Sequence, residues 1–328
     1  MKLCKKCILN DNMPSVSIGE NGLCNYCARE KPHRAKPENE DELYSVIASS
    51  RDKPYQVLLA YSGGKDSSYT LKLLREKYGL SVLTVTFDNG FMSDRCLKNI
   101  RTVTAVLGTD NIMIRYAYPD MCRLFNRASK SDLFPVKAME RASTICISCI
   151  SLVKSLMYRE AIQRRIPIIC FGWTPGQIGI PNPLIKLDYQ MILANEKQIR
   201  DKILAMMGEG FNRFFMDPGW LKENKEHIPY LYYPFVNNEY DEEVIVRSIQ
   251  AIGWEMEEET DSNSTNCLLN TYANFIHQDR FGFHPYCMEM ANMVRQGLIK
   301  RESALRKISN IGSIQNVRKI GSILSQYE

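Results

Sequence analysis

The feature that most constrains this chain is a short glycine-containing loop, residues 61–68, with the sequence Tyr-Ser-Gly-Gly-Lys-Asp-Ser-Ser. It lies between an apolar run at 57–61 and a helical pattern that starts at residue 67. Adjacent glycines let backbone N–H groups approach an anion, and the N-terminus of the next helix adds partial positive charge. The loop therefore predicts a phosphate site, with a plain strand-to-helix turn as the alternative. It is not a Walker loop, because the Gly-x4-Gly-Lys-Ser/Thr spacing is absent.

Around this loop, apolar runs and helical patterns alternate along the chain. Apolar or β-branched runs predict strands at 57–61, 81–87, 112–116 and 166–172. Helical periodicity predicts helices at 40–50, 67–77, 96–107 and 144–164. Such alternation is typical of βαβ units, so we expect an α/β fold with a doubly wound parallel sheet. Beyond residue 177 the strand signal fades, and helices are expected at 184–207, 240–252, 270–281 and 285–296.

The length of 328 residues allows one large domain with small appendages. We expect a cysteine-rich segment at 1–32, a linker and helix at 33–54, an α/β domain at 55–215 and a helical C-terminal region at 216–328. The net charge of +5 permits phosphorylated ligands but is not the basic footprint of a dedicated nucleic-acid binder. No run approaches the roughly 18 apolar residues of a membrane helix, and no secretory signal opens the chain. We therefore expect a cytoplasmic protein without a membrane partner.

Cysteine spacing is the second strong signal. Six of the eleven cysteines fall in three Cys-x-x-Cys pairs, and in a reducing compartment such pairs indicate metal before disulfides. Two pairs near the N-terminus are separated by sixteen residues, the spacing of a four-cysteine zinc ribbon. Four thiolates leave no open coordination position, so this Zn²⁺ would be structural, with unmetallated thiols as the alternative. The expected ligands are Cys4, Cys7, Cys24 and Cys27.

Residues 62–67 match the Ser-Gly-Gly-x-Asp-Ser signature, and the chain resembles PP-loop (N-type) ATP pyrophosphatases over roughly residues 55–180. The resemblance implies the adenine nucleotide alpha-hydrolase-like fold, cleavage of ATP between its α- and β-phosphates, and transfer of AMP to a substrate oxygen. It assigns pyrophosphate binding to Ser62, Gly63, Gly64, Asp66 and Ser67. The residue types themselves add hydroxyl donors, a mobile cation at Lys65, and at Asp66 a carboxylate that holds Mg²⁺ or orders the loop. The end of the second strand, with Phe87 and Asp88, would recognise adenosine. The loop residues concerned are Ser62, Gly63, Gly64, Lys65, Asp66, Ser67 and Ser68.

A second cysteine set lies near the expected carboxyl ends of the strands. Cys146 and Cys149 begin a predicted helix, and Cys267 ends a polar stretch at 261–267. Three thiolates can hold a [4Fe–4S] cluster with one iron left for an external ligand. PP-loop enzymes that thiolate nucleosides include members with this plan, and the resemblance gives these three cysteines the ligand positions. Cys170 and Cys287 are rivals for the third position, and a second zinc or simple packing of Cys146 and Cys149 are alternatives.

Other residues carry weaker signals. Gly172 opens a turn-rich strand end at 172–177, the position of a substrate or ATP contact in α/β folds. His284 lies in an aromatic stretch and fits a packing turn better than an acid–base group. Three cysteines in helical or strand patterns are expected in the core, namely Cys96, Cys122 and Cys170.

These features favour three functions. The first is sulfur transfer, in which ATP adenylates a carbonyl oxygen of a small molecule or tRNA and sulfur from a donor displaces AMP. The second is amide transfer, because the N-terminal cysteines followed by the loop also resemble N-acetyl sugar amidotransferases, which take ammonia from a separate glutaminase subunit. The third is a non-enzymatic nucleotide-binding adaptor. The expected cofactors are ATP, Mg²⁺, Zn²⁺ and the [4Fe–4S] cluster, and a homodimer is compatible with the sequence.

Overall fold

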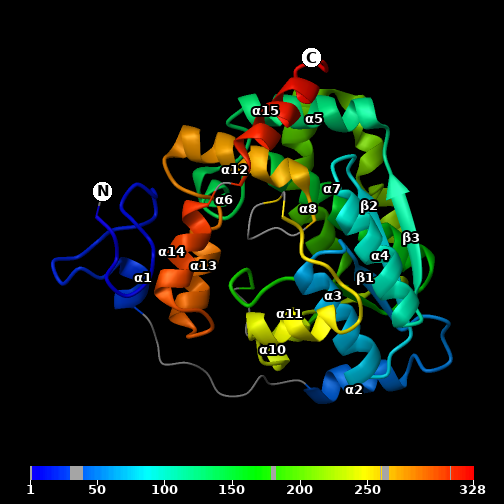
Figure 1. Cartoon of the computed structure of the whole chain (residues 1–328). Helices are drawn as coiled ribbons and strands as arrows, with labels where there is room; N and C mark the ends of the chain where they lie inside the picture. The colour runs from blue at the N-terminus through cyan, green and yellow to red at the C-terminus, as the bar shows by residue number, and fades with distance from the viewer. Residues whose placement is uncertain (1, 30–39, 179–181, 259, 261–265, 311) are drawn as a thin grey trace.

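The structure, a computed structural model, describes residues 2–29, 40–178, 182–258, 260, 266–310 and 312–328. Its centre is a six-stranded sheet in the order β3-β2-β1-β4-β6-β5 (Figure 1). Every strand pair is parallel except β5 with β6. The sheet confirms the predicted α/β class. The strands are β1 (Val57–Ala60), β2 (Val82–Asp88), β3 (Asp110–Arg115), β4 (Ile168–Phe171), β5 (Leu184–Lys186) and β6 (Tyr230–Tyr232).

Helices cover both faces of the sheet. Alternating side chains of β1 face opposite ways: Val57 and Leu59 join one buried cluster, and Leu58 joins another. The first cluster lies under α3, α4 and α11, and the second under α7 and α8. The helices around the sheet are α2 (Glu40–Ala48), α3 (Lys65–Lys72) with its π-helical continuation (Leu73–Lys77), α4 (Asp94–Val106), α5 (Tyr118–Lys130), α6 (Val136–Met139), α7 (Thr144–Gln163), α8 (Tyr189–Met207), α9 (Pro218–Glu223), α10 (Pro234–Asn237) and α11 (Glu242–Gln250).

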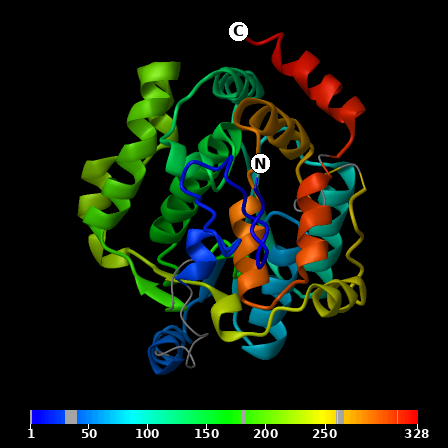
Figure 2. The same cartoon turned by 90° about the vertical axis from the view of Figure 1, so that its left-hand side faces the viewer.

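The remaining α-helices belong to the two ends of the chain. The N-terminal segment carries α1 (Asn25–Ala28) and two isolated bridges, Leu3 with Asn10 and Ile18 with Cys24. It packs beside α13 and α14 in both views (Figures 1 and 2). Two short 3₁₀ segments occupy Glu209–Phe214 and Lys225–His227. The C-terminal helices are α12 (Leu268–Phe281), α13 (Cys287–Arg295), α14 (Arg301–Ser309) and α15 (Ile314–Leu324).

One predicted element is wrong at its start. The helix expected over 184–207 begins at Tyr189, where Asp188 caps it, and Leu184–Lys186 instead forms β5. β5 pairs antiparallel with β6, a second strand that the sequence pattern did not indicate. Strands of three residues are too short for a periodicity signal, so only their pairing partners define them.

Domain boundaries are not set by this arrangement and stay predictions. Residues 30–39 of the expected linker, and 261–265 of the polar stretch before Cys267, lie outside the described residues. Within the part of the chain that the structure describes, no helix combines the length and apolar character needed to cross a membrane.

Candidate functional site

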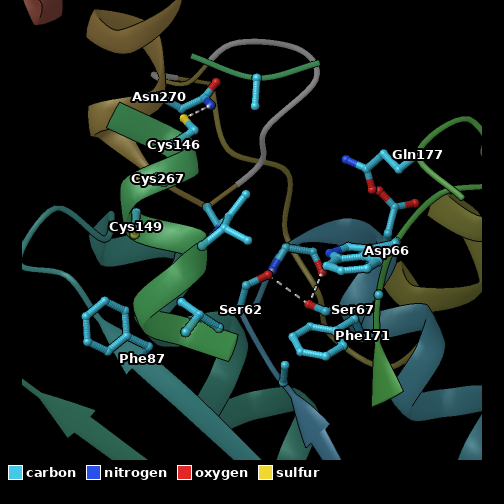
Figure 3. A pocket seen from close by; sticks show the side chains of 18 of the residues that line it. Ser62, Asp66, Ser67, Phe87, Cys146, Cys149, Phe171, Gln177, Cys267 and Asn270 are labelled. Atoms are coloured by element: carbon cyan, nitrogen blue, oxygen red, sulfur yellow. Dashed lines mark hydrogen bonds between the residues drawn. The ribbon is translucent and has the colours of Figure 1, made fainter. Parts of the chain in front are cut away.

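A cavity of about 350 Å³ opens at the carboxyl ends of β1, β2 and β4 (Figure 3). Parallel α/β sheets bind ligands at this edge, where neighbouring strands lead to helices on opposite faces. The cavity brings together sequence-distant segments: the Ser-Gly-Gly loop (residues 61–68), the end of β2, the start of α7, the turn after β4, and α12 and α13. Its lining includes Ser62, Gly64, Lys65, Asp66, Ser67, Phe87, Asn89, Cys146, Cys149, Gly172, Thr174, Gln177, Cys267, Asn270 and Glu289.

The Ser-Gly-Gly loop has the geometry of an anion cradle. Gly63 has a φ of +71°, and a side chain there would lie 2.7 Å from Ile100 Cγ1 and 2.9 Å from Cys96 Sγ of α4. Gly64 is the N-cap of α3, and the first turn of this helix, with Lys65, Asp66 and Ser67, borders the cavity. The hydroxyls of Ser62 and Ser67 lie 3.1 Å apart across the loop. Glycine is thus required at residue 63 by conformation and by packing.

Lys65 and Asp66 are held by the segment that enters α11. The Lys65 ammonium donates to Glu242 Oε1 at 2.8 Å and to the Tyr240 hydroxyl at 3.1 Å, and that hydroxyl donates to Asp66 Oδ1 at 2.9 Å. Burial lowers the pKa of Lys65, but Asp66 and Glu242 outweigh it, so the net pKa is raised. Lys65 is therefore a charged, buried and paired side chain in this structure, and its expected role as a mobile cation stays a prediction.

Gly172 joins β4 to the Ser-Gly-Gly loop. A Cβ atom at this residue would lie 2.6 Å from Ser67 Cα and 2.7 Å from Ser67 N, at the first turn of α3. The backbone of the β4 turn can approach the loop this closely only without a side chain.

Replacing Gly172 with alanine should therefore push the loop out of place. We expect a loss of about 1–3 kcal/mol in stability and weaker binding of an ATP analogue, measured by thermal unfolding and titration calorimetry. Gly210→Ala is a matched control, because its Cβ would meet only Arg213 Nη1 at 4.0 Å. Unchanged nucleotide binding in Gly172→Ala would contradict the role of this contact.

Only some of the residues at the end of β2 line the cavity. Phe87 and Asn89 line it, whereas Asp88 does not. The buried Asp88 carboxylate pairs with Arg115 and accepts from the backbone N–H of Gly90 at 2.8 Å. In this arrangement Asp88 orders the turn, and its predicted contact with adenosine stays a prediction.

Cys146, Cys149 and Cys267 face the same cavity from two segments of the chain. The Asn89 amide donates to Cys149 Sγ at 3.7 Å and to Cys267 Sγ at 3.4 Å, and the Asn270 amide donates to Cys146 Sγ at 3.6 Å. Burial raises the pKa of Cys149 and of Cys267, so both thiols are neutral unless a metal binds them.

These sulfurs are spread more widely than the ligands of one ion, and a multi-iron cluster is a group that they could hold. A single metal ion needs ligand atoms that lie close together. Among the described residues, the cysteine sulfurs within 4.8 Å of one another are those at the N-terminus, and the three cavity cysteines do not form such a group. In a cluster each thiolate binds its own iron, so the sulfurs can lie farther apart. Amide donors toward the sulfurs are the outer contacts that tune such a centre. The rivals lie elsewhere: Cys170 is buried in the core of the sheet, and Cys287 packs beside the N-terminal segment.

The N-terminal sulfurs of Cys4, Cys7, Cys24 and Cys27 all lie within 4.8 Å of one another and are buried. Cys7 Sγ and Cys24 Sγ are 3.6 Å apart, close to the roughly 3.8 Å of a tetrahedral site with metal–sulfur bonds of about 2.3 Å. Backbone N–H groups of Leu9, Cys24 and Cys27 donate to three of these sulfurs. The set fits one tetrahedral ion, and its donors suit zinc or iron.

Glu289 of α13 is a cavity residue that the sequence did not indicate. It accepts from the Thr174 hydroxyl at 2.7 Å. Burial, together with the nearby charge of Asp66, raises its pKa to about 7, although contacts with Thr174 and Gln177 oppose the shift. The carboxylate therefore changes charge near neutral pH.

Because the folded-state pKa of Glu289 is raised, its contribution to stability is complete below about pH 4.5 and is lost as the pH rises through about 7. Glu289→Gln should remove this loss and leave the protein more stable than the parent at pH 8, by at most about 3 kcal/mol at 1.36 kcal/mol per pKa unit. Urea unfolding at pH 5 and pH 8 measures the free energy of unfolding of both proteins. Glu302→Gln is the control, because Glu302 is exposed. A Glu289→Gln protein that is less stable than the parent at pH 8 would contradict this.

Other residues of the site had a weak signal in the sequence or none. Asn89 lies at the end of the second predicted strand and Asn270 three residues after Cys267, so both positions gave a local hint. Tyr240 and Glu242 gave none, because Glu242 is 177 residues from Lys65. His284 is buried outside the cavity lining, where its Nδ1 accepts from the N–H of Tyr286, as in a packing turn.

Comparisons with known proteins find no matching family model. The chain is 25% identical over 275 residues to an uncharacterized protein of Methanocaldococcus jannaschii, covering 84% of this chain and 79% of that protein. Argininosuccinate synthases of Dehalococcoides mccartyi and Pyrococcus furiosus are 54% identical over 39 residues, 12% of this chain and 10% of theirs. A structure of the U34-tRNA thiolase NcsA of Methanococcus maripaludis with its [4Fe–4S] cluster matches at 14% identity and a TM-score of 0.39, over 100% of this chain and 90% of that one. A TM-score this low does not establish a shared fold, and the site has to be interpreted from its own residues.

Proposed function

We propose that the chain is an ATP pyrophosphatase of the PP-loop class that adenylates a carbonyl oxygen and then replaces AMP with sulfur. The observation that carries this proposal is the shared cavity. The Ser-Gly-Gly loop with Lys65 and Asp66 lines it together with Cys146, Cys149 and Cys267. A nucleotide held by the loop and a sulfur source held near the cysteines would therefore meet at one substrate group.

The chemistry explains why both parts are needed. Oxide is a poor leaving group, so the carbonyl oxygen first attacks the α-phosphorus of ATP, and the bond between the α-phosphorus and the bridging oxygen breaks to release pyrophosphate. Sulfide from a donor then attacks the carbonyl carbon, and the carbon–oxygen bond breaks to release AMP. The loop N–H groups and serine hydroxyls hold the departing pyrophosphate. Asp66 would hold the Mg²⁺ of ATP.

The three cavity cysteines would hold a [4Fe–4S] cluster. Such a cluster supplies an iron without a protein ligand, to which an external sulfur can bind. Asn89 and Asn270 donate toward the sulfurs and fix their orientation. We assign the N-terminal site to structural Zn²⁺, and we propose a small molecule or tRNA as the acceptor.

The decisive measurement is the content of iron, acid-labile sulfide and zinc in protein purified without oxygen. About four irons with sulfide and one zinc per chain would support sulfur transfer. Zinc without iron, even after anaerobic reconstitution, would overturn the cluster and favour amide transfer with ammonia from a glutaminase. ATP binding without pyrophosphate release, in the presence of either nucleophile, would instead indicate the non-enzymatic adaptor.

A further inference from the structure

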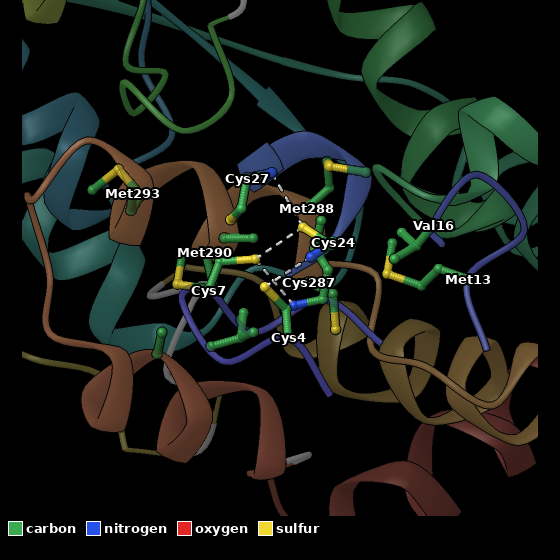
Figure 4. Close-up of a cluster of buried hydrophobic side chains, with 14 of the residues drawn as sticks. Cys4, Cys7, Met13, Val16, Cys24, Cys27, Cys287, Met288, Met290 and Met293 are labelled. Carbon is green, nitrogen blue, oxygen red and sulfur yellow. Dashed lines mark hydrogen bonds between the residues drawn. The ribbon is translucent and has the colours of Figure 1, made fainter. Parts of the chain in front are cut away.

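The N-terminal metal ribbon (residues 2–28) is attached to the C-terminal helices at its metal-binding turns. Arg301 of α14 donates from Nε to the carbonyl of Cys7 at 2.9 Å and from Nη2 to the carbonyl of Cys4 at 3.0 Å. Buried side chains of the ribbon pack against Cys287, Met288 and Met290 of α13 (Figure 4). The ribbon therefore covers one side of α13.

The other side of α13 holds the turn that follows β4. Glu289 accepts from the Thr174 hydroxyl at 2.7 Å, and Asn292 Nδ2 donates to the carbonyl of Gly176 at 2.8 Å. A Cβ on Gly176 would lie 2.6 Å from the Glu289 carbonyl oxygen, so helix and turn are in backbone contact. The same turn begins at Gly172, against the first turn of α3. A continuous line of contacts thus joins the ribbon to the Ser-Gly-Gly loop.

A second connection runs to α7. Ser15 of the ribbon donates its backbone N–H to Glu140 Oε1 at 2.6 Å and its hydroxyl to Glu140 Oε2 at 2.5 Å. Glu140 is 2% exposed. Three residues later, Ser143 caps α7 by accepting from the N–H of Cys146. The ribbon therefore contacts segments on two sides of the cavity.

From these contacts we propose that the metal site of the ribbon and the ATP site stabilise each other through α13, with Arg301 and Asn292 as positioning residues. The ribbon has too few residues to fold without its metal. When the metal leaves, α13 loses its cover and the turn at 172–177 loses its support. Because coupling between two binding sites is reciprocal, ATP must then also hold the metal more tightly. This inference rests on the proposed function only in that ATP binds at the loop.

The test measures the equilibrium affinity of the full-length protein for zinc, by competition with a chromogenic chelator, with and without α,β-methylene-ATP, which cannot be cleaved between its α- and β-phosphates. We expect the analogue to tighten zinc binding about fivefold or more, the lower end of typical coupling. In Asn292→Ala and in Arg301→Gln the analogue should change the zinc affinity by less than about twofold, a loss of most of that coupling. Arg306→Gln is the matched control on α14, because Arg306 is exposed and, among the described residues, donates to the neighbouring Ser303 alone.

Calorimetric titration of the same samples with the analogue separates the two proposals. If the analogue binds the parent protein but leaves the zinc affinity unchanged, the coupling is overturned while the ATP site stands. An equal gain in zinc affinity in the parent and in Asn292→Ala would also overturn the route through α13, even if Arg301→Gln failed to fold. If the analogue does not bind at all, the proposed ATP site fails, and the coupling fails with it.

Discussion

Replacing Asp66 with alanine should lower pyrophosphate release from ATP by about a hundredfold or more, the usual cost of removing a group that stabilises developing charge. Asp66 is the acidic side chain of the Ser-Gly-Gly loop, and it lies 3.6 Å from the Lys65 ammonium at the cavity. Without it, the loop loses its candidate Mg²⁺ ligand, and the Tyr240 hydroxyl loses its acceptor. Pyrophosphate release in an enzyme-coupled assay with ATP and a saturating carbonyl acceptor, for which bulk tRNA is the first candidate, measures the effect.

Two further variants show whether the loss is specific. Glu76→Ala removes another acid, just after α3, and should leave release unchanged. Within the described part of the chain, Glu76 forms its ion pair with the partly exposed Lys72 alone. Tyr240→Phe keeps the aromatic ring but removes the hydroxyl between Lys65 and Asp66, and it should cause a smaller loss. Undiminished pyrophosphate release in Asp66→Ala would exclude this loop as the site of cleavage.

Replacing Cys149 with alanine should abolish transfer of sulfur and reduce bound iron to near zero after anaerobic reconstitution. Cys149 is one of three thiols at the cavity, and two remaining thiolates leave a [4Fe–4S] cluster without sufficient ligands. Binding of α,β-methylene-ATP should stay within about twofold of the parent, less than 0.5 kcal/mol, because the Ser-Gly-Gly loop does not contain the substituted residue. Iron analysis, the visible absorption of the cluster and calorimetry measure the three effects.

The same experiment distinguishes the candidates for the third ligand. Cys267→Ala should behave like Cys149→Ala, since both sulfurs accept from Asn89. Cys170→Ala and Cys287→Ala should keep their iron, because these two thiols are buried in other clusters. Full iron content and product formation in Cys149→Ala would exclude the cluster. Iron loss in Cys287→Ala but not in Cys267→Ala would show that Cys287, and not Cys267, is the third ligand.

The sequence by itself determined the parts of the site that depend on neighbouring residues. The Ser-Gly-Gly loop needs two glycines between a strand and a helix, and both conditions are visible within residues 57–77. The N-terminal metal site follows from pair spacing, because each Cys-x-x-Cys turn presents two sulfurs to one ion. The parallel sheet follows from the alternation of strand and helix patterns over residues 55–172.

Only the tertiary structure decided which distant residues contact these local motifs. Glu242 contacts Lys65 although they are 177 residues apart in the sequence, and Glu289 contacts Thr174 at a separation of 115 residues. No local pattern encodes such contacts, because they depend on how α11 and α13 pack against the sheet. Likewise, spacing could not select Cys267 over Cys170 or Cys287 as the companion of Cys149. The bridge between Met92 and Cys267, together with the amide of Asn89, brings that sulfur to the cavity.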